Sequence, residues 1–369
     1  MDIQKKLNES VEKGAVHGVI AAAATDKGVI FEGAAGGLKT DSVIWIASMT
    51  KAITGAAAMQ LVERGKLSLD APAADIVPEI AKKEVLLSID ADGTVHTRPP
   101  KRPITLRHLL THTSGMGYDT WDAEIFRYVQ VKGPFKPATM AALSTPLLFD
   151  PGERWEYSIA IDWAGFMVEA VSGQRLDRYM TENIFTPLGM GDTGFAISPG
   201  MRPRKAAVHV RQDGGGFSPT NHELDQAPEV FQGGGALYST VPDYLKFTST
   251  LLKGGAPILR PETVAEMFRN SMNEGVLCRP LATQIPARST DMNFVDGMKW
   301  GLTFMINPEA FPGRRAAESL TWGGLANSYF WIDPAKKVTG VWATQLLPFY
   351  DPKAVAAFED FERAVYAGL

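Results

Sequence analysis

The stretch Trp45-Ile46-Ala47-Ser48-Met49-Thr50-Lys51-Ala52 decides which fold and chemistry are expected of this 369-residue chain. If Ser48 begins a helix, the spacing of three residues places the Lys51 amine on the same face, within reach of the serine hydroxyl. A lysine takes a proton from serine only if burial or nearby positive charge lowers the pKa of its amine. The next residues, 52–59, are small or apolar and predict a buried helix. The pattern therefore indicates a nucleophile beside a base.

A second Ser-x-x-Lys occurs at Ser10-Val11-Glu12-Lys13 and serves as an internal comparison. It lies in a polar segment, where the lysine is expected to be solvated and to stay protonated. The motif alone is therefore weak evidence, and only the copy at Ser48 combines it with a buried helix start.

Composition limits the classes of partner. The chain has 45% hydrophobic and 21% charged residues and a net charge of -4, without a block of Lys or Arg. This balance is typical of a globular protein and argues against nucleic acid or an anionic membrane as the main partner. We expect a small-molecule ligand. The sequence does not predict an oligomeric state.

The beginning of the chain and its cysteine content predict a cytoplasmic protein. Residues 1–10 lack the apolar core of a signal peptide, and no stretch has eighteen uninterrupted apolar residues. The single cysteine, Cys278, cannot form an internal disulfide, which is typical of a reducing compartment.

Periodicity predicts a mixed layer built from both ends of the chain. An amphipathic helix is expected over residues 2–13, and a hairpin over 19–24 and 29–33. Near the other end, aromatic and β-branched runs predict strands over 328–333 and 338–345. A final helix is expected over about 352–366, with Asp351 as its N-cap. The middle of the chain, 66–200, is mostly helical by pattern, apart from a hairpin around Asp92-Gly93.

A tyrosine after a Pro-Gly turn is the first candidate partner of Ser48. The segment Asp150-Pro151-Gly152-Glu153-Arg154-Trp155-Glu156-Tyr157-Ser158-Ile159 presents Tyr157 just before an apolar helix. A tyrosine hydroxyl beside a lysine ammonium relays a proton between serine and leaving group. Tyr238, before Ser239, is a rival, and a structural core position is the alternative for either tyrosine.

A second candidate partner is Thr321-Trp322-Gly323-Gly324-Leu325. Two glycines at the start of a strand let a substrate lie against the backbone and expose N–H groups, which an oxyanion requires.

Two further patterns have structural interpretations. His108 and His112 are four residues apart, but no third ligand accompanies them, so structural hydrogen bonding is favoured over metal binding. The three glycines 233–235 lack the spacing of a nucleotide-binding loop. They are interpreted as a close approach of backbone to a substrate or a helix.

With these segments in place, the chain resembles the serine β-lactamase and penicillin-binding-protein superfamily, in its class C-like branch that includes the family VIII carboxylesterases. The resemblance covers nearly the whole chain. Its five motifs, in family order, are Ser48-x-x-Lys51, Ile104 to Gly115, Pro151-Gly152-x-x-Trp155-x-Tyr157-Ser158, Gly233-Gly234-Gly235 with Ser239-Thr240 and Asp243, and Trp322-Gly323-Gly324.

The resemblance implies an α/β (α+β) fold of the serine β-lactamase and DD-peptidase type, with an antiparallel sheet flanked by helices and a mainly helical lobe. It implies one catalytic unit over residues 1–369. The α/β subdomain is expected from about 1–46 and 205–369, and the helical subdomain from about 47–204.

The resemblance also implies the roles of the site residues. Ser48 would be the acylated nucleophile, and Lys51 and Tyr157 the proton-transfer pair, with the general base left open between them. The backbone N–H groups of Ser48 and Leu325 would form the oxyanion hole. No metal or cofactor is implied.

Two departures from the β-lactamase pattern shape the expected substrate. Ile159 stands where β-lactamases carry Asn, and Trp322-Gly323-Gly324 stands where they carry Lys-Thr-Gly. Both changes remove groups that would hold a β-lactam, and the second is similar to the esterases. Ile159, Trp322, Gly323 and Gly324 are the expected substrate-binding residues.

The expected function is a carboxylesterase that hydrolyses small, short-chain, uncharged esters through an acyl-Ser48 intermediate. One alternative is an acyltransferase, which passes the acyl group to an alcohol instead of water. The others are a β-lactamase or a D-amino-acid peptidase of the same fold, and a non-catalytic binding protein. No Gly-x-Ser-x-Gly segment occurs, which argues against an α/β-hydrolase.

Overall fold

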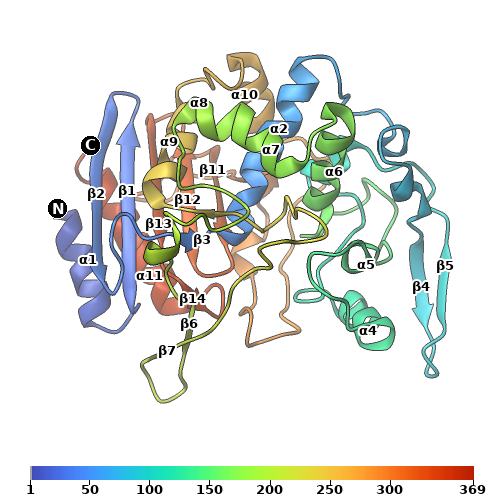
Figure 1. Cartoon of the computed structure of the whole chain (residues 1–369), viewed down its shortest axis with the longest axis horizontal. Coiled ribbons are helices and arrows are strands. Elements are labelled where there is room, and N and C mark those ends of the chain that lie inside the picture. The colour runs from blue at the N-terminus through green and yellow to red at the C-terminus, as the bar shows by residue number, and fades with distance from the viewer. Residues whose placement is uncertain (1) are drawn as a thin grey trace.

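A seven-stranded antiparallel sheet forms the centre of the computed structural model, which describes residues 2–369 (Figure 1). The strand order is β2-β1-β13-β12-β11-β10-β9. The strands are β1 Gly18–Thr25, β2 Gly28–Gly36, β9 Lys299–Trp300, β10 Met305–Asn307, β11 Ser319–Gly324, β12 Ser328–Asp333 and β13 Val338–Ala343. Strand β1 pairs with β13, so both ends of the chain build one sheet, as predicted.

Helices cover both faces of this sheet. Because successive side chains of a strand point to opposite faces, neighbouring residues of β12 identify the two layers. Phe330 packs against Tyr244 of α9 (Val241–Leu252), and Trp331 packs against Phe358 of α11 (Pro352–Tyr366). Helix α1 (Ile3–Glu12) lies beside α11. The α/β fold with an antiparallel sheet flanked by helices is therefore confirmed.

The helical lobe lies at the end of the molecule opposite the two chain termini (Figure 1). Its α6 (Ala160–Ser172) packs against α2 (Thr50–Glu63), which connects the lobe to the rest of the fold. The expected hairpin around Asp92-Gly93 is present as β4 and β5. The remaining elements of the lobe are β4 Val85–Ile89, β5 Val95–Arg98, α3 Leu106–Leu110, α4 Ala123–Lys132, α5 Met140–Leu143, α7 Leu176–Met180 and α8 Thr186–Leu188.

Several strands of two or three residues were not predicted, because such short segments carry no readable periodicity. They are β3 Ile44–Trp45, β6 His209–Arg211, β7 Phe217–Pro219, β8 Tyr238–Ser239 and β14 Leu346–Leu347. The eight-residue helix α10, Pro261–Phe268, was also not predicted. The glycines 323 and 324 were expected at the start of a strand, but they end β11 instead. The whole of β11 is buried, although Ser319-Leu320-Thr321-Trp322 alternates polar and apolar residues.

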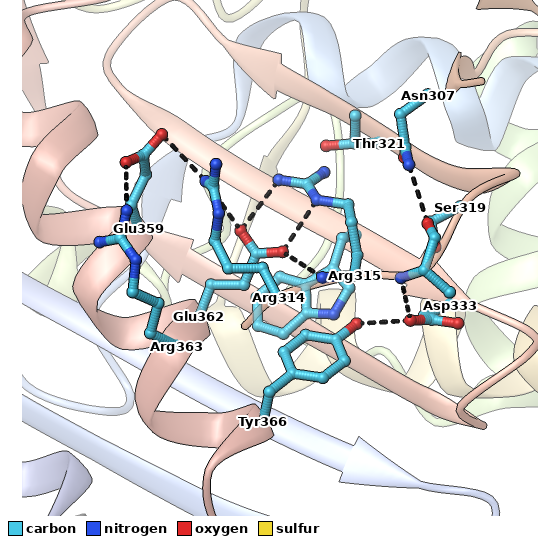
Figure 2. A network of polar contacts seen from close by, with 12 residues as sticks. Asn307, Arg314, Arg315, Ser319, Thr321, Asp333, Glu359, Glu362, Arg363 and Tyr366 are labelled. Atoms are coloured by element: carbon cyan, nitrogen blue, oxygen red, sulfur yellow. Dashed lines mark hydrogen bonds and ion pairs between the residues drawn. The ribbon is translucent and has the colours of Figure 1, made fainter. Parts of the chain in front are cut away.

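A buried ion pair holds α11 against the segment before β11 (Figure 2). The carboxylate of Glu362 is 0% exposed and accepts from Arg315 Nε at 2.8 Å and Nη2 at 3.0 Å. Arg314 lies 3.5 Å from the same carboxylate and 2.9 Å from that of Glu359. At the end of α11, the hydroxyl of Tyr366 donates to the carboxylate of Asp333 in β12 at 2.8 Å.

Glu362→Gln is expected to lower the free energy of unfolding by about 3–5 kcal/mol, because it leaves a buried guanidinium without its counter-charge. The matched control is Glu359→Gln on the same helix, whose side chain is 31% exposed. This control is expected to cost at most about 1 kcal/mol. Urea unfolding of both variants measures the difference, and equal losses would contradict the prediction.

Candidate active site

Ser48 lies in a 3-10 turn, Ala47–Met49, that runs directly into α2. The predicted helix start is therefore present. The preceding residue, Ala47, has a φ of +43°, a left-handed conformation that costs a non-glycine residue about 1–3 kcal/mol. Such strain is held by surrounding structure. Here the end of β11 packs on the turn so closely that a Cβ on Gly324 would lie 2.3 Å from the carbonyl oxygen of Ile46.

The Lys51 amine is fully buried and has three polar neighbours. Its Nζ lies 3.2 Å from Ser48 Oγ, 3.0 Å from the hydroxyl of Tyr118 and 2.6 Å from the carbonyl oxygen of Gly234. A carbonyl only accepts, so one N–H of the amine is directed to Gly234. In the neutral amine, the lone pair is then available to a hydroxyl, and the arrangement can remove the proton of Ser48.

Burial and a nearby carboxylate together set the pKa of the Lys51 amine. Burial lowers the pKa of its amine to about 7, and the nearby carboxylate of Asp162 opposes this shift. Burial in turn raises the pKa of Asp162. Asp162 is held in place by the N–H of Gly234, which donates to its Oδ1 at 2.8 Å. The amine is therefore partly neutral near pH 7, as a base requires.

The pH profile provides a test of this arrangement. If neutral Lys51 is the base, kcat/KM is expected to rise with pH through about 7. Asp162→Asn removes the charge that favours the ammonium, so the pKa of Lys51 falls and the rising limb moves to lower pH. The amide oxygen still accepts from Gly234. A limb that stays in place, or moves to higher pH, would show that Lys51 is not the group that titrates.

Tyr157 is the second buried group at Ser48. Its hydroxyl accepts from Trp322 Nε1 at 2.9 Å, and its ring centroid lies 4.8 Å from Lys51 Nζ. Burial raises the pKa of Tyr157, while contacts with the Ser48 hydroxyl and the Trp322 indole work against this shift. The phenol therefore keeps its proton at neutral pH and is suited to donate it.

The two N–H groups expected for the oxyanion hole lie on elements in contact. Ser48 is at the second position of the 3-10 turn, where a backbone N–H has no acceptor within the helix. Leu325 follows the last residue of β11, and its N–H donates to no backbone acceptor within residues 2–369. Because Gly324 touches Ile46, the strand end and the serine turn meet. The oxyanion hole itself stays a prediction.

The expected substrate-binding residues fall into two groups. Trp322 and Gly323 line a cavity of about 210 Å³ that reaches Phe358 of α11, and Ser48, Lys51 and Tyr157 are not part of its lining. Trp322 is more than an apolar wall, because its indole N–H bonds to Tyr157. Ile159 caps the start of α6 and is buried in the main core. Its role towards a substrate stays a prediction.

The structure also assigns the patterns that had structural interpretations. The rival Tyr238 lies in β8, and its hydroxyl accepts from the N–H of Leu224 rather than approaching Lys51. His108 closes a capping box with Thr105. The glycine run approaches a helix, since Gly233 O accepts from Thr54 Oγ1 of α2 at 2.6 Å.

Sequence reasoning missed Tyr118, Asp162 and His112 as neighbours of the site. His112 packs on Tyr157 with ring centroids 4.7 Å apart, and its Nδ1 lies 3.1 Å from Ser158 Oγ. Tyr118 follows a Gly-rich loop without periodicity. A polar Asp162 in the otherwise apolar start of α6 was the one signal available, because a buried carboxylate needs a partner.

Comparisons with known proteins identify what this chain is similar to. The family model described as Beta-lactamase matches residues 3–364. Monacolin J acid methylbutanoyltransferase of Aspergillus terreus is 33% identical over 347 residues, which cover 89% of this chain and 83% of that protein. Lovastatin esterase of Penicillium rubens is 32% identical over 363 residues, covering 91% and 90%. The unliganded structure of simvastatin synthase (LovD) from Aspergillus terreus superposes with a TM-score of 0.85 at 28% identity, covering 99% and 97%.

These relatives correct one expectation. The short-chain carboxylesterase predicted from the sequence is wrong, because the relatives favour the acyltransferase alternative. The error has a chemical cause: hydrolysis and transfer share the acyl-serine, and the motifs describe only its formation. None of the helices within residues 2–369 is both long and apolar enough to span a bilayer.

Proposed function

The chain belongs to the Beta-lactamase family, and on that premise we propose that it is an acyltransferase, which passes an acyl group through Ser48 to an alcohol. The relatives that support transfer match the chain over 89% of its length. The Trp322-Gly323-Gly324 segment additionally supports a position near the family VIII esterases within this family.

In the first half-reaction, neutral Lys51 removes the proton of Ser48, and Oγ attacks the carbonyl carbon of the acyl donor. The N–H groups of Ser48 and Leu325 hold the oxyanion that forms. When the bond to the leaving group breaks, that group takes a proton from the Lys51 ammonium or the Tyr157 hydroxyl. The acyl group is now an ester of Ser48.

In the second half-reaction, the same groups work in reverse order. An acceptor alcohol loses its proton to whichever of Lys51 and Tyr157 gave its own proton to the leaving group, and the alcohol oxygen attacks the acyl-serine carbonyl. Collapse of the oxyanion breaks the bond to Ser48 Oγ, which takes the proton back. The product is a new ester, and the enzyme returns to its starting state.

The likeness to acyltransferases over 89% of the chain carries the proposal. At the site, the buried Lys51 amine lies 3.2 Å from Ser48 Oγ and 3.0 Å from the hydroxyl of Tyr118. The same amine can take a proton first from the serine and then from an acceptor alcohol.

A partition experiment tests the proposal. The protein is incubated with a methylbutanoyl thioester and either monacolin J acid, 1-butanol or no alcohol, and mass spectrometry measures new ester and free acid. We expect ester to exceed acid with an apolar polycyclic acceptor, and total thioester consumption to rise with acceptor concentration. Free acid as the only product, at a rate independent of every alcohol, would overturn transfer.

A further inference from the structure

The turn after α3, residues 112–115, holds the segment that carries Tyr157. Its carbonyl oxygens accept three backbone hydrogen bonds from that segment: Leu148 N–H to Gly115 O at 2.6 Å, Gly152 N–H to Thr113 O at 2.7 Å, and Glu156 N–H to His112 O at 2.9 Å. The two segments are so close that a Cβ on Gly115 would lie 2.3 Å from the carbonyl oxygen of Phe149. Tyr157 directly follows the last of these bonds.

His112 also contacts the residue on the other side of Tyr157. Its Nδ1 lies 3.1 Å from Ser158 Oγ, and both side chains are 0% exposed. His112 therefore bonds to Glu156 and to Ser158, the residues before and after the tyrosine. The His112 ring packs on the tyrosine itself, with ring centroids 4.7 Å apart.

The backbone of His112 has an uncommon conformation that these contacts explain. Its φ is +56°, in the left-handed region, which costs a non-glycine residue about 1–3 kcal/mol. Asn, Asp and His adopt this region most readily among such residues. The carbonyl oxygen and the ring of His112 both contact residues 156–158. The same contacts that fix Tyr157 thus hold the strained conformation.

The imidazole is neutral and is not a second base. Burial and the nearby Lys51 amine hold the pKa of His112 well below its usual range. A neutral imidazole bonds to the Ser158 hydroxyl in either tautomer, because a hydroxyl both donates and accepts. Within residues 2–369, no hydrogen bond joins the His112 side chain to Ser48 or to Lys51. His112 therefore contacts the reacting groups through Tyr157.

The position of the Tyr157 hydroxyl matters for proton transfer. This hydroxyl contacts the Ser48 hydroxyl and accepts from Trp322 Nε1 at 2.9 Å. A proton moves between heavy atoms about 2.6–3.2 Å apart, and a displacement of about 1 Å costs roughly a hundredfold in rate. A phenylalanine in place of His112 would fill the same space but would not bond to Ser158.

We propose that His112 is a positioning residue, which fixes Tyr157 through Ser158 and through its own ring so that the phenol stays at Ser48. The inference rests on the proposed function in one respect, the acylation of Ser48. It does not depend on whether an alcohol or water then takes the acyl group.

His112→Phe keeps a ring and removes the contact of Nδ1. The measured rate is total consumption of a methylbutanoyl thioester, counted whether ester or free acid forms, so a failure of transfer to alcohols does not affect the test. We expect kcat to fall about ten- to a hundredfold, with KM nearly unchanged. Ser158→Ala removes the same contact from the other side with a smaller change in volume, and should lower kcat by a similar factor.

Tyr157→Phe provides the background that separates positioning from a general loss of structure. Without the Tyr157 hydroxyl there is no acid–base group left to position. Adding His112→Phe to Tyr157→Phe should therefore lower kcat by less than about threefold, because the two changes remove one function. If His112→Phe does not fold, Ser158→Ala is compared in the same two backgrounds.

Two further variants complete the comparison. His112→Asn is the conservative one, since Asn adopts the left-handed region and places an amide atom near the position of Nδ1. It should keep more of the parent kcat than His112→Phe. Thr111→Val is the matched control, because it removes a hydroxyl that bonds only to Arg107 O and Thr113 Oγ1. It should leave kcat unchanged even if the protein unfolds at a lower temperature.

Two results would overturn the inference. One is an equal loss from His112→Phe in the parent and in Tyr157→Phe, which would show that the effect does not pass through the tyrosine. The other is a loss no larger than that of Thr111→Val. A parent protein that consumes no thioester would contradict the proposed function instead. The rate of phosphonate labelling of Ser48 then replaces kcat in every comparison.

Discussion

Ser48→Ala is expected to abolish acyl transfer, with a loss in kcat of about 10⁴- to 10⁶-fold, as found when a covalent nucleophile is removed. The reason is positional. Only this serine combines an Oγ at 3.2 Å from a buried amine with a turn that contacts the end of β11. The measurement is the rate of ester formation from a thioester and an alcohol, with bound acyl group followed by intact-protein mass spectrometry.

Ser10→Ala is the matched control, because it removes the serine of the other Ser-x-x-Lys. In the structure, Ser10 Oγ donates to the carbonyl oxygen of Leu7 within α1, and Lys13 pairs with Glu9. Turnover should be unchanged. A phosphonate label found on a serine other than Ser48, in a protein that keeps its activity, would disprove the assignment.

The second large effect concerns Lys51 and Tyr157, which we expect to act as one unit. Lys51→Met and Tyr157→Phe should each lower kcat by about 10²- to 10⁴-fold, the usual contribution of acid–base groups. Both groups exchange protons with the same serine oxygen, so their losses should not add. The double variant should be little worse than the worse single one.

Tyr238→Phe is the control for this cycle. It removes a tyrosine hydroxyl that bonds to the backbone of Leu224, and the ring of Tyr238 packs in a small buried cluster with Val43 and Val208. Turnover should remain within a few-fold of the parent protein. If the losses at Lys51 and Tyr157 multiply, the two residues act independently, and the prediction that they act as one unit is wrong.

The sequence predicted features that depend on local signals. Ser48 and Lys51 are three residues apart, and α11 has Asp351 as its cap and a clear period, so both were found. Tyr118 and Gly234 contact the same amine from positions 67 and 183 residues away. No local pattern encodes such contacts. Only the close packing of the lobe on the sheet brings them together.

The acceptor of the acyl group was wrongly predicted for a related reason. Trp322 was interpreted from its size and lack of charge, yet its indole N–H is directed to the Tyr157 hydroxyl. Trp322 thus bonds to another motif residue. The motifs describe how the acyl-serine forms, and no local pattern in them predicts whether water or an alcohol then takes the acyl group.

The pairing of β1 with β13 has a consequence for synthesis of the chain. Ile20 is synthesised long before Ala343, its partner across the sheet. At about 5–20 residues per second, that interval lasts roughly 15 to 65 seconds. During it, the apolar strand Gly18–Thr25 has no neighbour on its β13 side. Unpaired apolar edges promote association between chains. We therefore expect newly made chains to depend on chaperones until the last strands leave the ribosome.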